Sequence, residues 1–419
     1  MNIWLVTIGE PIPHAENKLR LHRTGIFAKY ISENSNHEVT WWTSAFNHFT
    51  KESIFTKTKS FNLNDKLKII AIKGKGYKKN ISIDRIIDHA QVAKEFSFLS
   101  KKERVPDIIV ASFPTLGLCN SANKFAKANN IPLLIDYRDL WPEVFTDLLP
   151  LKIQFLGKIA LFELFRRTNT VFKQADGIIG ITKPYLQIAL DKIKRHKNKN
   201  DAVFPLAYLK NQFSEIEYND AEKFWETKNI KLNDNVFRIC FFGTLGYQFD
   251  FDTVIAAARS LTTINIQFIF CGTGDRHDEM MEYSKQLNNI ILPGYINAAQ
   301  IKSLMERSDI GLCPYYSKKS FLNSVPGKAI EYLSAGLPLL NSLSDGILGQ
   351  LVNNNKLGFN YIPGSKDSLV EILLRIEKGE FNLKIFKENN LDFYKKNYEA
   401  EVVFNKYMQH LEFVSNNYN

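Results

Sequence analysis

The chain has 419 residues, 45% of them hydrophobic and 23% charged, and a formal net charge of +10 at pH 7. This composition excludes a disordered, collagen-like or multi-spanning membrane protein, and the length favours two domains over a single hydrophobic core. The positive charge either belongs to a basic surface exposed to solvent or faces an anionic partner. Because no nucleic-acid motif accompanies it, we expect that partner to be a membrane surface or a phosphorylated ligand and not nucleic acid.

The first residues, MNIWLVTIGEPIP, predict a buried strand. They carry no basic segment and too short an apolar run for a signal peptide, so we expect a cytoplasmic protein. Short apolar runs then alternate with longer amphipathic stretches, which is the pattern of a parallel sheet covered by helices. The first half is expected to form strands at Asn2–Ile8, Glu38–Thr43, Leu67–Lys73, Asp107–Ser112, Pro132–Asp136 and Gly177–Thr182, and helices at Thr24–Ser35, Ile83–Ser100, Leu116–Asn129 and Leu151–Ala175.

The stretch LLIDYRDLWPE, residues 133–143, is the strongest local signal in this half. An apolar strand ends in Asp136, and polar side chains follow at its carboxyl end, where parallel sheets bind their ligands. Arg138 and Asp139 are therefore candidates for a functional site. A buried Asp–Arg pair that only stabilises the turn is the competing interpretation.

A largely apolar stretch with basic residues at both ends occupies Leu151–Gln174. Lys158 and Glu163 interrupt it, so it is not expected to span a bilayer. It could dock on an anionic leaflet, as apolar helices with basic ends do, or it could be buried as a helix between two domains. The residues alone leave these two interpretations open.

The pattern pauses at a polar segment around Ala207–Asn219 and then resumes. Two successive sets of strands and helices predict an α/β protein with two doubly wound, Rossmann-like domains that face one another across a cleft. We place the N-terminal domain at 1–208 and the C-terminal domain at 209–395, and expect a helix in 396–419 to pack back on the first domain. Strands of the second half are expected at Val236–Phe242, Ile266–Gly272, Asn289–Leu292, Asp309–Pro314, Pro338–Asn341 and Phe359–Ile362.

Glycine-containing turns follow the first two strands of the second half. Gly243 and Gly246 lie in one turn, and Gly272 lies in the other. Glycine lets the backbone approach a ligand, and free amides at the start of the following helix favour phosphate. Each turn is weak evidence by itself, because most such turns only connect a strand to a helix.

The stretch NSVPGKAIEYLSAGLPLL, residues 323–340, reads as a loop, a helix that begins near Gly327, a glycine C-cap and a buried strand. Lys328 lies in the first turn of that helix, where a cation is unfavourable unless an anion joins it. A pyrophosphate would supply the anion, and Glu331 is placed to accept hydrogen bonds from ribose hydroxyls. For these two residues alone, an exposed Lys–Glu pair is the commoner explanation.

The segment VPGKAIEYLSAGLPLL resembles the donor-site signature of family-four retaining glycosyltransferases, which have the GT-B architecture. The family often has two glutamates here; Glu331 matches the second, whereas Asn323 occupies the position of the first. A basic residue common after the first glycine turn is also missing from Tyr247–Asp252. The resemblance implies that 1–208 is the acceptor-binding domain and 209–395 the nucleotide-sugar-binding domain. It implies a donor site made of Gly243, Thr244, Gly272, Pro326, Gly327, Lys328 and Glu331.

The start of the chain resembles bacterial members of that family that assemble surface polysaccharides. The RDLWP element resembles members that act on deoxy-amino sugars or N-acetylhexosamines, and this implies that Asp139 is a catalytic group on the acceptor side. Arg23, beside a predicted helix start, also suggests an anion, whereas a lone histidine such as His48 is more often structural. The cleft residues implied on this side are Glu10, Arg20, Arg23, Thr24, Gly25, His48 and Arg138.

The expected function is that of a retaining glycosyltransferase that moves an N-acetylated or deoxy-amino hexose from a UDP-sugar to a lipid-linked saccharide in capsule or O-antigen synthesis. We expect it on the inner face of the cell membrane, in peripheral contact with anionic lipid. No cofactor is expected, and because the four cysteines form no CxxC pair, no metal site is expected either. A UDP-sugar epimerase of the same fold and a non-catalytic membrane-associated scaffold remain as alternatives.

Overall fold

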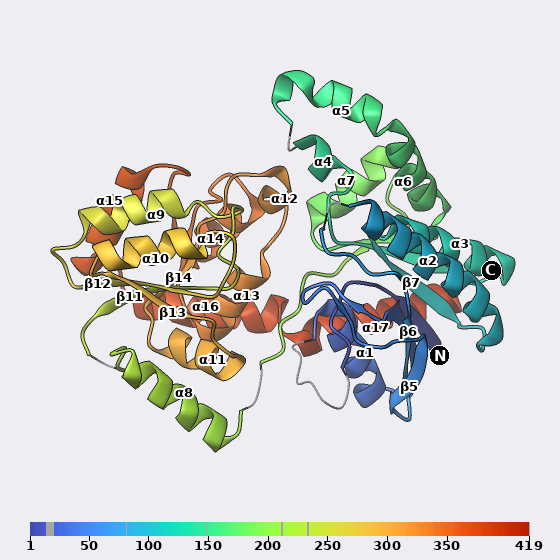
Figure 1. The fold of residues 1–419 in the computed structure, drawn as a ribbon, viewed down its shortest axis with the longest axis horizontal. Helices are drawn as coiled ribbons and strands as arrows, with labels where there is room; N and C mark the ends of the chain where they lie inside the picture. Colours follow the sequence, from blue (N-terminus) through green and yellow to red (C-terminus); the bar gives the residue numbers. More distant parts are fainter. Residues whose placement is uncertain (14–20, 81, 148, 211–212, 233, 419) are drawn as a thin grey trace. The chain divides into compact units, whose positions relative to one another are not determined.

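The computed structural model describes residues 1–13, 21–80, 82–147, 149–210, 213–232 and 234–418. The chain divides into two compact units; in Figure 1 the first is coloured blue to green with a red C-terminal helix, and the second green to red-orange. Unit 1 comprises Met1–Ala207 and Glu401–Asn419, and unit 2 comprises Tyr208–Ala400. Each unit is built around its own largely parallel sheet.

Within the described residues, unit 1 contains an eight-stranded sheet in the order β10-β9-β8-β7-β1-β2-β6-β5. All its neighbouring strands are parallel except β5, which runs antiparallel to β6 at one edge. The strands are β1 (Asn2–Val6), β2 (Glu38–Ser44), β5 (Lys59–Asn64), β6 (Leu67–Ile72), β7 (Ile108–Phe113), β8 (Leu133–Tyr137), β9 (Gly177–Gly180) and β10 (Ala202–Val203), and a separate hairpin pairs β3 (Phe46–Asn47) with β4 (Glu52–Ser53).

Both faces of the unit 1 sheet are covered, so its inner strands are continuous apolar runs, as IWLV in β1 illustrates. On one face, Trp4 and Trp42 pack with helices α2 (Ile83–Leu99), α3 (Leu116–Ala128), α6 (Phe162–Gln174) and α7 (Lys183–Ile193). On the other face lie α1 (Arg23–Asn34) and α17 (Ala400–Asn416), which are side by side in Figure 1. The ring of Phe27 in α1 stacks on that of Tyr407 in α17, with centroids 4.4 Å apart.

Within the described residues, unit 2 contains a six-stranded parallel sheet in the order β13-β12-β11-β14-β15-β16. The order reverses between β11 and β14, and ligands bind beside such a reversal at the carboxyl ends of the strands. The strands are β11 (Phe237–Phe242), β12 (Ile266–Cys271), β13 (Ile290–Gly294), β14 (Ile310–Cys313), β15 (Leu339–Asn341) and β16 (Gly358–Asn360). The helices are α8 (Glu215–Thr227), α9 (Phe251–Ser260), α10 (His277–Gln286), α11 (Ala298–Glu306), α12 (Lys319–Leu322), α13 (Gly327–Ala335), α14 (Ile347–Asn355), α15 (Lys366–Glu377) and α16 (Leu383–Asn397).

The single helix expected over Leu151–Ala175 is wrong. A short 3₁₀ turn (Leu151–Ile153) leads into α5 (Gln154–Ala160), and the backbone leaves the helical region at Leu161 (φ −99°, ψ 12°) before α6 begins. Helix α6 packs through Thr168, Val171 and Phe172, whereas α5 has no buried residue. Figure 1 shows α5 standing out from the sheet of unit 1.

Candidate functional site

The two glycine turns meet at the carboxyl edge of the unit 2 sheet. Gly243 follows β11 and Gly272 follows the neighbouring β12, and the Gly243 amide donates to the carbonyl of Cys271 over 2.9 Å. Gly272 has φ +134°, and a Cβ atom on it would overlap the carbonyl oxygen of Gly243. Only glycine fits this contact, so the two loops lie against one another without side chains between them.

Helix α13 brings Lys328 to the first of these turns. The Lys328 ammonium donates to the carbonyl of Phe242, at the end of β11, and lies 4.2 Å from the centre of the Phe241 ring. A Cβ atom on Gly243 would come 2.8 Å from the lysine Nζ. The helix begins after Pro326 with no side-chain cap and no acidic residue in its first turn, so its free amides and the lysine together attract an anion.

The remaining donor-site candidates lie in the same two loops and in α13. Thr244 is exposed beside Gly243, and Pro326 and Gly327 form the start of α13. Glu331 lies one turn further along the helix and is 7% exposed. Asn323, in the position of the missing family glutamate, caps α12 and donates through its side-chain amide to the carbonyl of Lys319 over 2.8 Å.

Two further residues at this edge were missed by sequence reasoning. Arg276 comes from the second glycine turn, yet its guanidinium lies 6.0 Å from the Tyr247 ring in the first turn and donates to Asp252 (2.5 Å) and Glu279 (2.6 Å). It supplies the basic group that the first turn lacks in sequence, although its buried, doubly paired position indicates that it braces the two loops. Glu279 is a local partner, three residues further along in α10, whereas Asp252 lies on α9, and this longer-range pairing could not be read from the sequence.

Tyr295 is the second residue at this edge that sequence reasoning missed. It follows β13 and is 77% exposed, and the Gly272 amide donates to the carbonyl of Gly294 over 2.8 Å, which joins its loop to the second glycine turn. An exposed ring at this edge can stack on a nucleobase. The signal available in the sequence was an aromatic residue directly after a strand-ending glycine.

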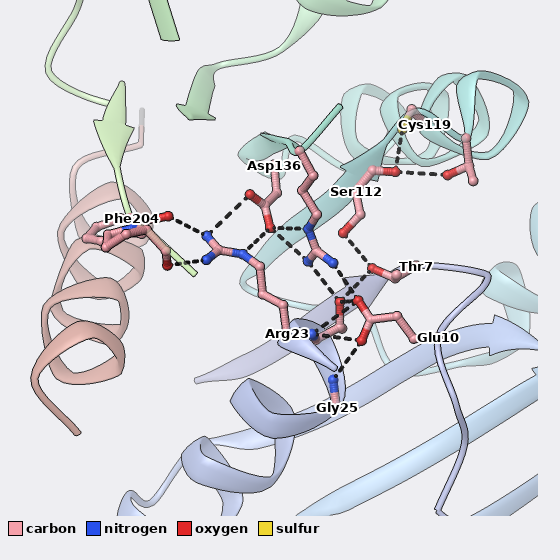
Figure 2. Close-up of polar contacts among 12 residues, drawn as sticks. Thr7, Glu10, Arg23, Gly25, Ser112, Cys119, Asp136 and Phe204 are labelled. Atoms are coloured by element: carbon pink, nitrogen blue, oxygen red, sulfur yellow. Dashed lines mark hydrogen bonds and ion pairs between the residues drawn. The ribbon is translucent and has the colours of Figure 1, made fainter. Parts of the chain in front are cut away.

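Five of the unit 1 candidates form one buried polar cluster between β1, α1 and the end of β8 (Figure 2). The Glu10 carboxylate accepts from the Thr24 amide (2.9 Å), the Thr24 hydroxyl (2.7 Å) and the Gly25 amide (3.2 Å). Arg138 donates to Glu10 (2.5 Å) and to Asp136 (2.8 Å). The carboxylate of Glu10 thus caps the start of α1, which sequence reasoning did not assign to it.

Arg23 completes this cluster, with its side chain 5% exposed. It donates to Asp136 over 3.1 Å and to the carbonyls of Phe204 (2.9 Å) and Pro205 (2.5 Å), as Figure 2 shows for Phe204. Burial would raise the pKa of the Asp136 carboxyl, but the guanidiniums of Arg138 and Arg23 outweigh it and hold that pKa below its ordinary value. The anion beside Arg23 in this structure is therefore Asp136. Arg20 lies outside the described residues.

His48 and Asp139 line a separate pocket of about 210 Å³ in unit 1. Its walls come from the ends of β1 and β7, the β3–β4 hairpin, the loop after β6 and the start of α2. Sequence reasoning missed three of its polar members, since Tyr77, Arg85 and His89 lie in a loop and a helix with no motif. The lining residues are Ile8, Gly9, Ser44, Phe46, His48, Tyr77, Arg85, Asp88, His89, Pro114, Thr115 and Asp139.

The electrostatics of this pocket suit hydrogen bonding to hydroxyl groups. His48 Nδ1 shares a hydrogen bond of 2.6 Å with the Tyr77 hydroxyl. Burial, with help from nearby cations, lowers the pKa of His48 and of His89 to about 4, so both imidazoles are neutral near pH 7 and offer one donor and one acceptor each. Burial by the surrounding residues raises the pKa of Asp139, which favours a role in proton transfer.

The apolar residues of α5 and the start of α6 are exposed. Phe155 is 59% exposed, Leu156 52%, Ile159 67% and Phe162 66%, and Lys158, Arg166 and Arg167 lie on the same two helices. Of the helices that the structure describes, none is both long enough and apolar enough to cross a membrane. The two interpretations of this segment were membrane docking and burial between two domains. Within unit 1 by itself, the apolar face of α5 and the start of α6 is uncovered.

Three comparisons bear on this chain. Residues 223–396 match a family model described as glycosyl transferases group 1. Solved structures match over nearly the full length: a sucrose-phosphate synthase from Thermosynechococcus elongatus (14% identity, TM-score 0.70, 99% of this chain and 98% of that one) and Anabaena HepE in complex with UDP-glucose (15%, 0.64, 99% and 100%). A UDP-forming trehalose-phosphate synthase from Burkholderia xenovorans also matches (11%, 0.66, 99% and 99%). No curated protein sequence matches. The expected GT-B fold is confirmed.

Proposed function

We propose that this glycosyltransferase takes its sugar from a UDP-linked donor held by unit 2 and transfers it with retention to a lipid-linked saccharide. The observation that carries the proposal is the position of the Lys328 ammonium, at the uncapped start of α13 and against the first glycine turn. This is the arrangement that binds a diphosphate. The complexes of HepE with UDP and UDP-glucose support the choice of nucleotide.

The chemistry follows from the charges at this edge. The diphosphate lies against Lys328 and the amides of the glycine turns, and Glu331 accepts from the ribose hydroxyls. Negative charge grows on the diphosphate as the glycosidic bond breaks, so a fixed ammonium stabilises the transition state more than the ground state. The acceptor hydroxyl attacks the anomeric carbon from the side that the diphosphate leaves. No resident metal is needed, since the lysine and the helix amides compensate the charge.

The unit 1 pocket holds the acceptor saccharide in this proposal. Neutral imidazoles of His48 and His89 bond to its hydroxyls, and Asp139 orients the attacking hydroxyl or accepts its proton. The sugar transferred is an N-acetylated or deoxy-amino hexose, and the product belongs to capsule or O-antigen synthesis. The exposed apolar face of α5 and α6 attaches the enzyme to the inner face of the membrane, where such acceptors are anchored.

A panel of UDP-, GDP- and ADP-sugars tests the donor. Native-state ligands raise the melting temperature by mass action, so UDP and one UDP-sugar should stabilise the protein more than the other nucleotides do. The same UDP-sugar, given with membrane extracts that contain lipid-linked saccharides, should release UDP and label the lipid fraction. Conversion of the UDP-sugar without any acceptor would indicate an epimerase, and stabilisation by GDP or ADP alone would contradict the UDP assignment.

A further inference from the structure

Helix α2 begins with an exposed apolar face. Ile83 is 75% exposed, Ile86 70% and Ile87 38%. Positions three and four apart lie on one side of a helix, so the three side chains form one surface. Farther along, α2 buries Val92 and Phe96 in the unit 1 core. The helix therefore packs by its second half and leaves its first turns uncovered within unit 1.

The tip of the β3–β4 hairpin, which lies beside the loop before α2, carries a further exposed apolar side chain. Phe49, at its tip, is 58% exposed. The hairpin is fixed to the loop before α2, because the Lys51 ammonium donates to the Asn80 side chain over 2.5 Å and lies 5.1 Å from the centre of the Tyr77 ring. The Arg85 guanidinium lies 5.6 Å from the centre of the same ring. The hairpin tip and the start of α2 are thus neighbours around Tyr77.

Positive charge concentrates around these apolar side chains. In the hairpin tip (48–52), the loop before α2 (73–82) and the first turn of α2 (83–86), six residues are basic and two are acidic. Lys75, Lys78 and Lys79 are exposed in the loop that leads to α2, and of these Lys75 pairs with Asp84 over 2.7 Å. We call Phe49, Lys51, Lys75, Lys78, Lys79, Ile83, Ile86 and Ile87 the α2 rim.

We propose that the α2 rim docks on the anionic surface of a lipid bilayer. Protruding apolar side chains among lysines insert into the headgroup region while the cations attract anionic lipid. A protein partner would be expected to meet carboxylates as well as lysines, and here basic side chains outnumber acidic ones by six to two. The rim forms a membrane contact in addition to the face of α5 and α6, on different elements of unit 1.

The rim also adjoins the pocket, since α2 carries both. Arg85 and His89 line the pocket, whereas Ile83, Ile86 and Ile87 on the same turns are exposed. If the pocket holds the acceptor saccharide, as proposed above, a lipid anchor that stays in the leaflet would lie beside the rim. This consequence rests on the proposed function, but docking of the rim itself does not.

Vesicle sedimentation with the full chain tests the proposal. The probes are vesicles of phosphatidylethanolamine with phosphatidylglycerol, and vesicles of phosphatidylcholine alone. The double variant Ile83→Glu/Ile86→Glu should bind the anionic vesicles about tenfold more weakly or worse than the native protein, and Lys78→Glu/Lys79→Glu should do the same at low salt. Ile216→Glu is the matched control, because Ile216 is 73% exposed in the first turn of α8 in unit 2.

The native melting temperature and UDP affinity should persist in all three variants, since the substituted side chains are exposed. Vesicle binding equal to that of the native protein for both rim variants would overturn the proposal. If a Phe155→Glu/Ile159→Glu variant alone lost binding, the α5–α6 contact would stand and the rim would not. A rim variant that changed the oligomeric state in light scattering, with no change on vesicles, would identify a second copy as the occupant and also overturn it. None of these outcomes depends on sugar transfer.

Discussion

Arg138 and Asp139 are adjacent in the chain but serve different sites. Arg138 turns into the buried cluster, where it donates to Asp136, Glu10 and the Thr24 hydroxyl. Asp139 instead lines the unit 1 pocket. The carboxylate that pairs with Arg138 and stabilises the turn is therefore that of Asp136. This ion pair does not involve the Asp139 carboxylate.

Asp139→Asn should lower turnover by about 10²–10⁴-fold, the usual contribution of general acid–base catalysis, with little change in melting temperature or UDP affinity. The raised pKa sets the pH dependence: a base is active when deprotonated, so the native rate should fall as pH drops through a pKa above the ordinary value of about 4. Kinetics, calorimetry and thermal melting on one variant measure all three quantities.

The exposed Asp65, in the turn between β5 and β6, provides the control, and Asp65→Asn should leave turnover unchanged. A destabilised Asp139→Asn protein with near-native turnover per folded molecule would show that Asp139 is structural.

Lys328→Ala should weaken UDP binding by about 1.5–3 kcal/mol, because a charge-assisted contact to the diphosphate is lost. Calorimetry with UDP measures this, and Lys366→Ala, at an exposed lysine of α15, should bind as the native protein does. Native affinity in both Lys328→Ala and Glu331→Ala would remove the donor site from α13.

Single residues were predictable where a motif placed them on an element. Lys328 could be placed at a helix start and Asp139 past a strand end, because VPGKAIEYL and LLIDYRD carry clear helix and strand patterns. The partners of Arg23 were not predictable. Asp136 is far from it in sequence, and a sequence cannot show whether a buried guanidinium meets a ligand or another side chain of the chain. The pairing of Arg276 with Asp252 was missed for the same reason.

At the scale of elements, the glycine turn after β12 is the tightest constraint on the candidate donor site. Gly272 combines φ +134° with a contact to the backbone of Gly243 that leaves no room for a side chain. The position of β12 beside β11 at the carboxyl edge depends on this contact, and so does the path of the loop that faces Lys328.

Gly272→Ala should lower the free energy of unfolding and weaken UDP binding together. Gly364→Ala is the matched control, because Gly364 has φ +74° but open space around its Cβ position, so it pays only the backbone cost of about 1–2 kcal/mol. Denaturant unfolding should show a larger loss for Gly272→Ala than for Gly364→Ala. If the two variants lost equal free energy of unfolding and Gly272→Ala kept the native UDP affinity, the turn would relax without moving the donor site.

Inner strands were predictable because they are buried on both faces and read as unbroken apolar runs. The edge strand β5 was missed, since KSFNLN has exposed residues along most of its length and no clear apolar alternation. The break at Leu161 was missed because the apolar composition of residues 151–174 continues across it. Composition shows that a segment is apolar, but it does not show which part of the segment packs against the rest of the protein.

At the scale of the whole molecule, exposed apolar surface and positive charge both favour a membrane-bound enzyme. Phe155→Glu/Ile159→Glu should reduce sedimentation with anionic vesicles, because these side chains are 59% and 67% exposed on α5. Binding by the native protein should weaken as salt rises, since charges are screened beyond about 10 Å at 0.1 M. Sedimentation at low and moderate salt measures both effects.

If the native protein binds anionic vesicles and the Phe155→Glu/Ile159→Glu variant binds them equally well, the membrane attachment must lie in other parts of the chain. Equal recovery of the native protein with neutral and anionic vesicles would contradict the electrostatic part of the interpretation.

Helix α17 has a consequence for the order in which the chain folds during synthesis. Unit 1 is made of two pieces of sequence with all of unit 2, Tyr208–Ala400, between them. The Tyr407 ring of α17 stacks on Phe27 and Phe204 at 4.4 Å each and lies under the guanidinium of Arg23. The ribosome takes roughly 10–40 s to make unit 2 at roughly 5–20 residues per second. During that time the nascent first unit exposes the aromatic surface that α17 will cover, and unit 2 can finish folding before unit 1 does.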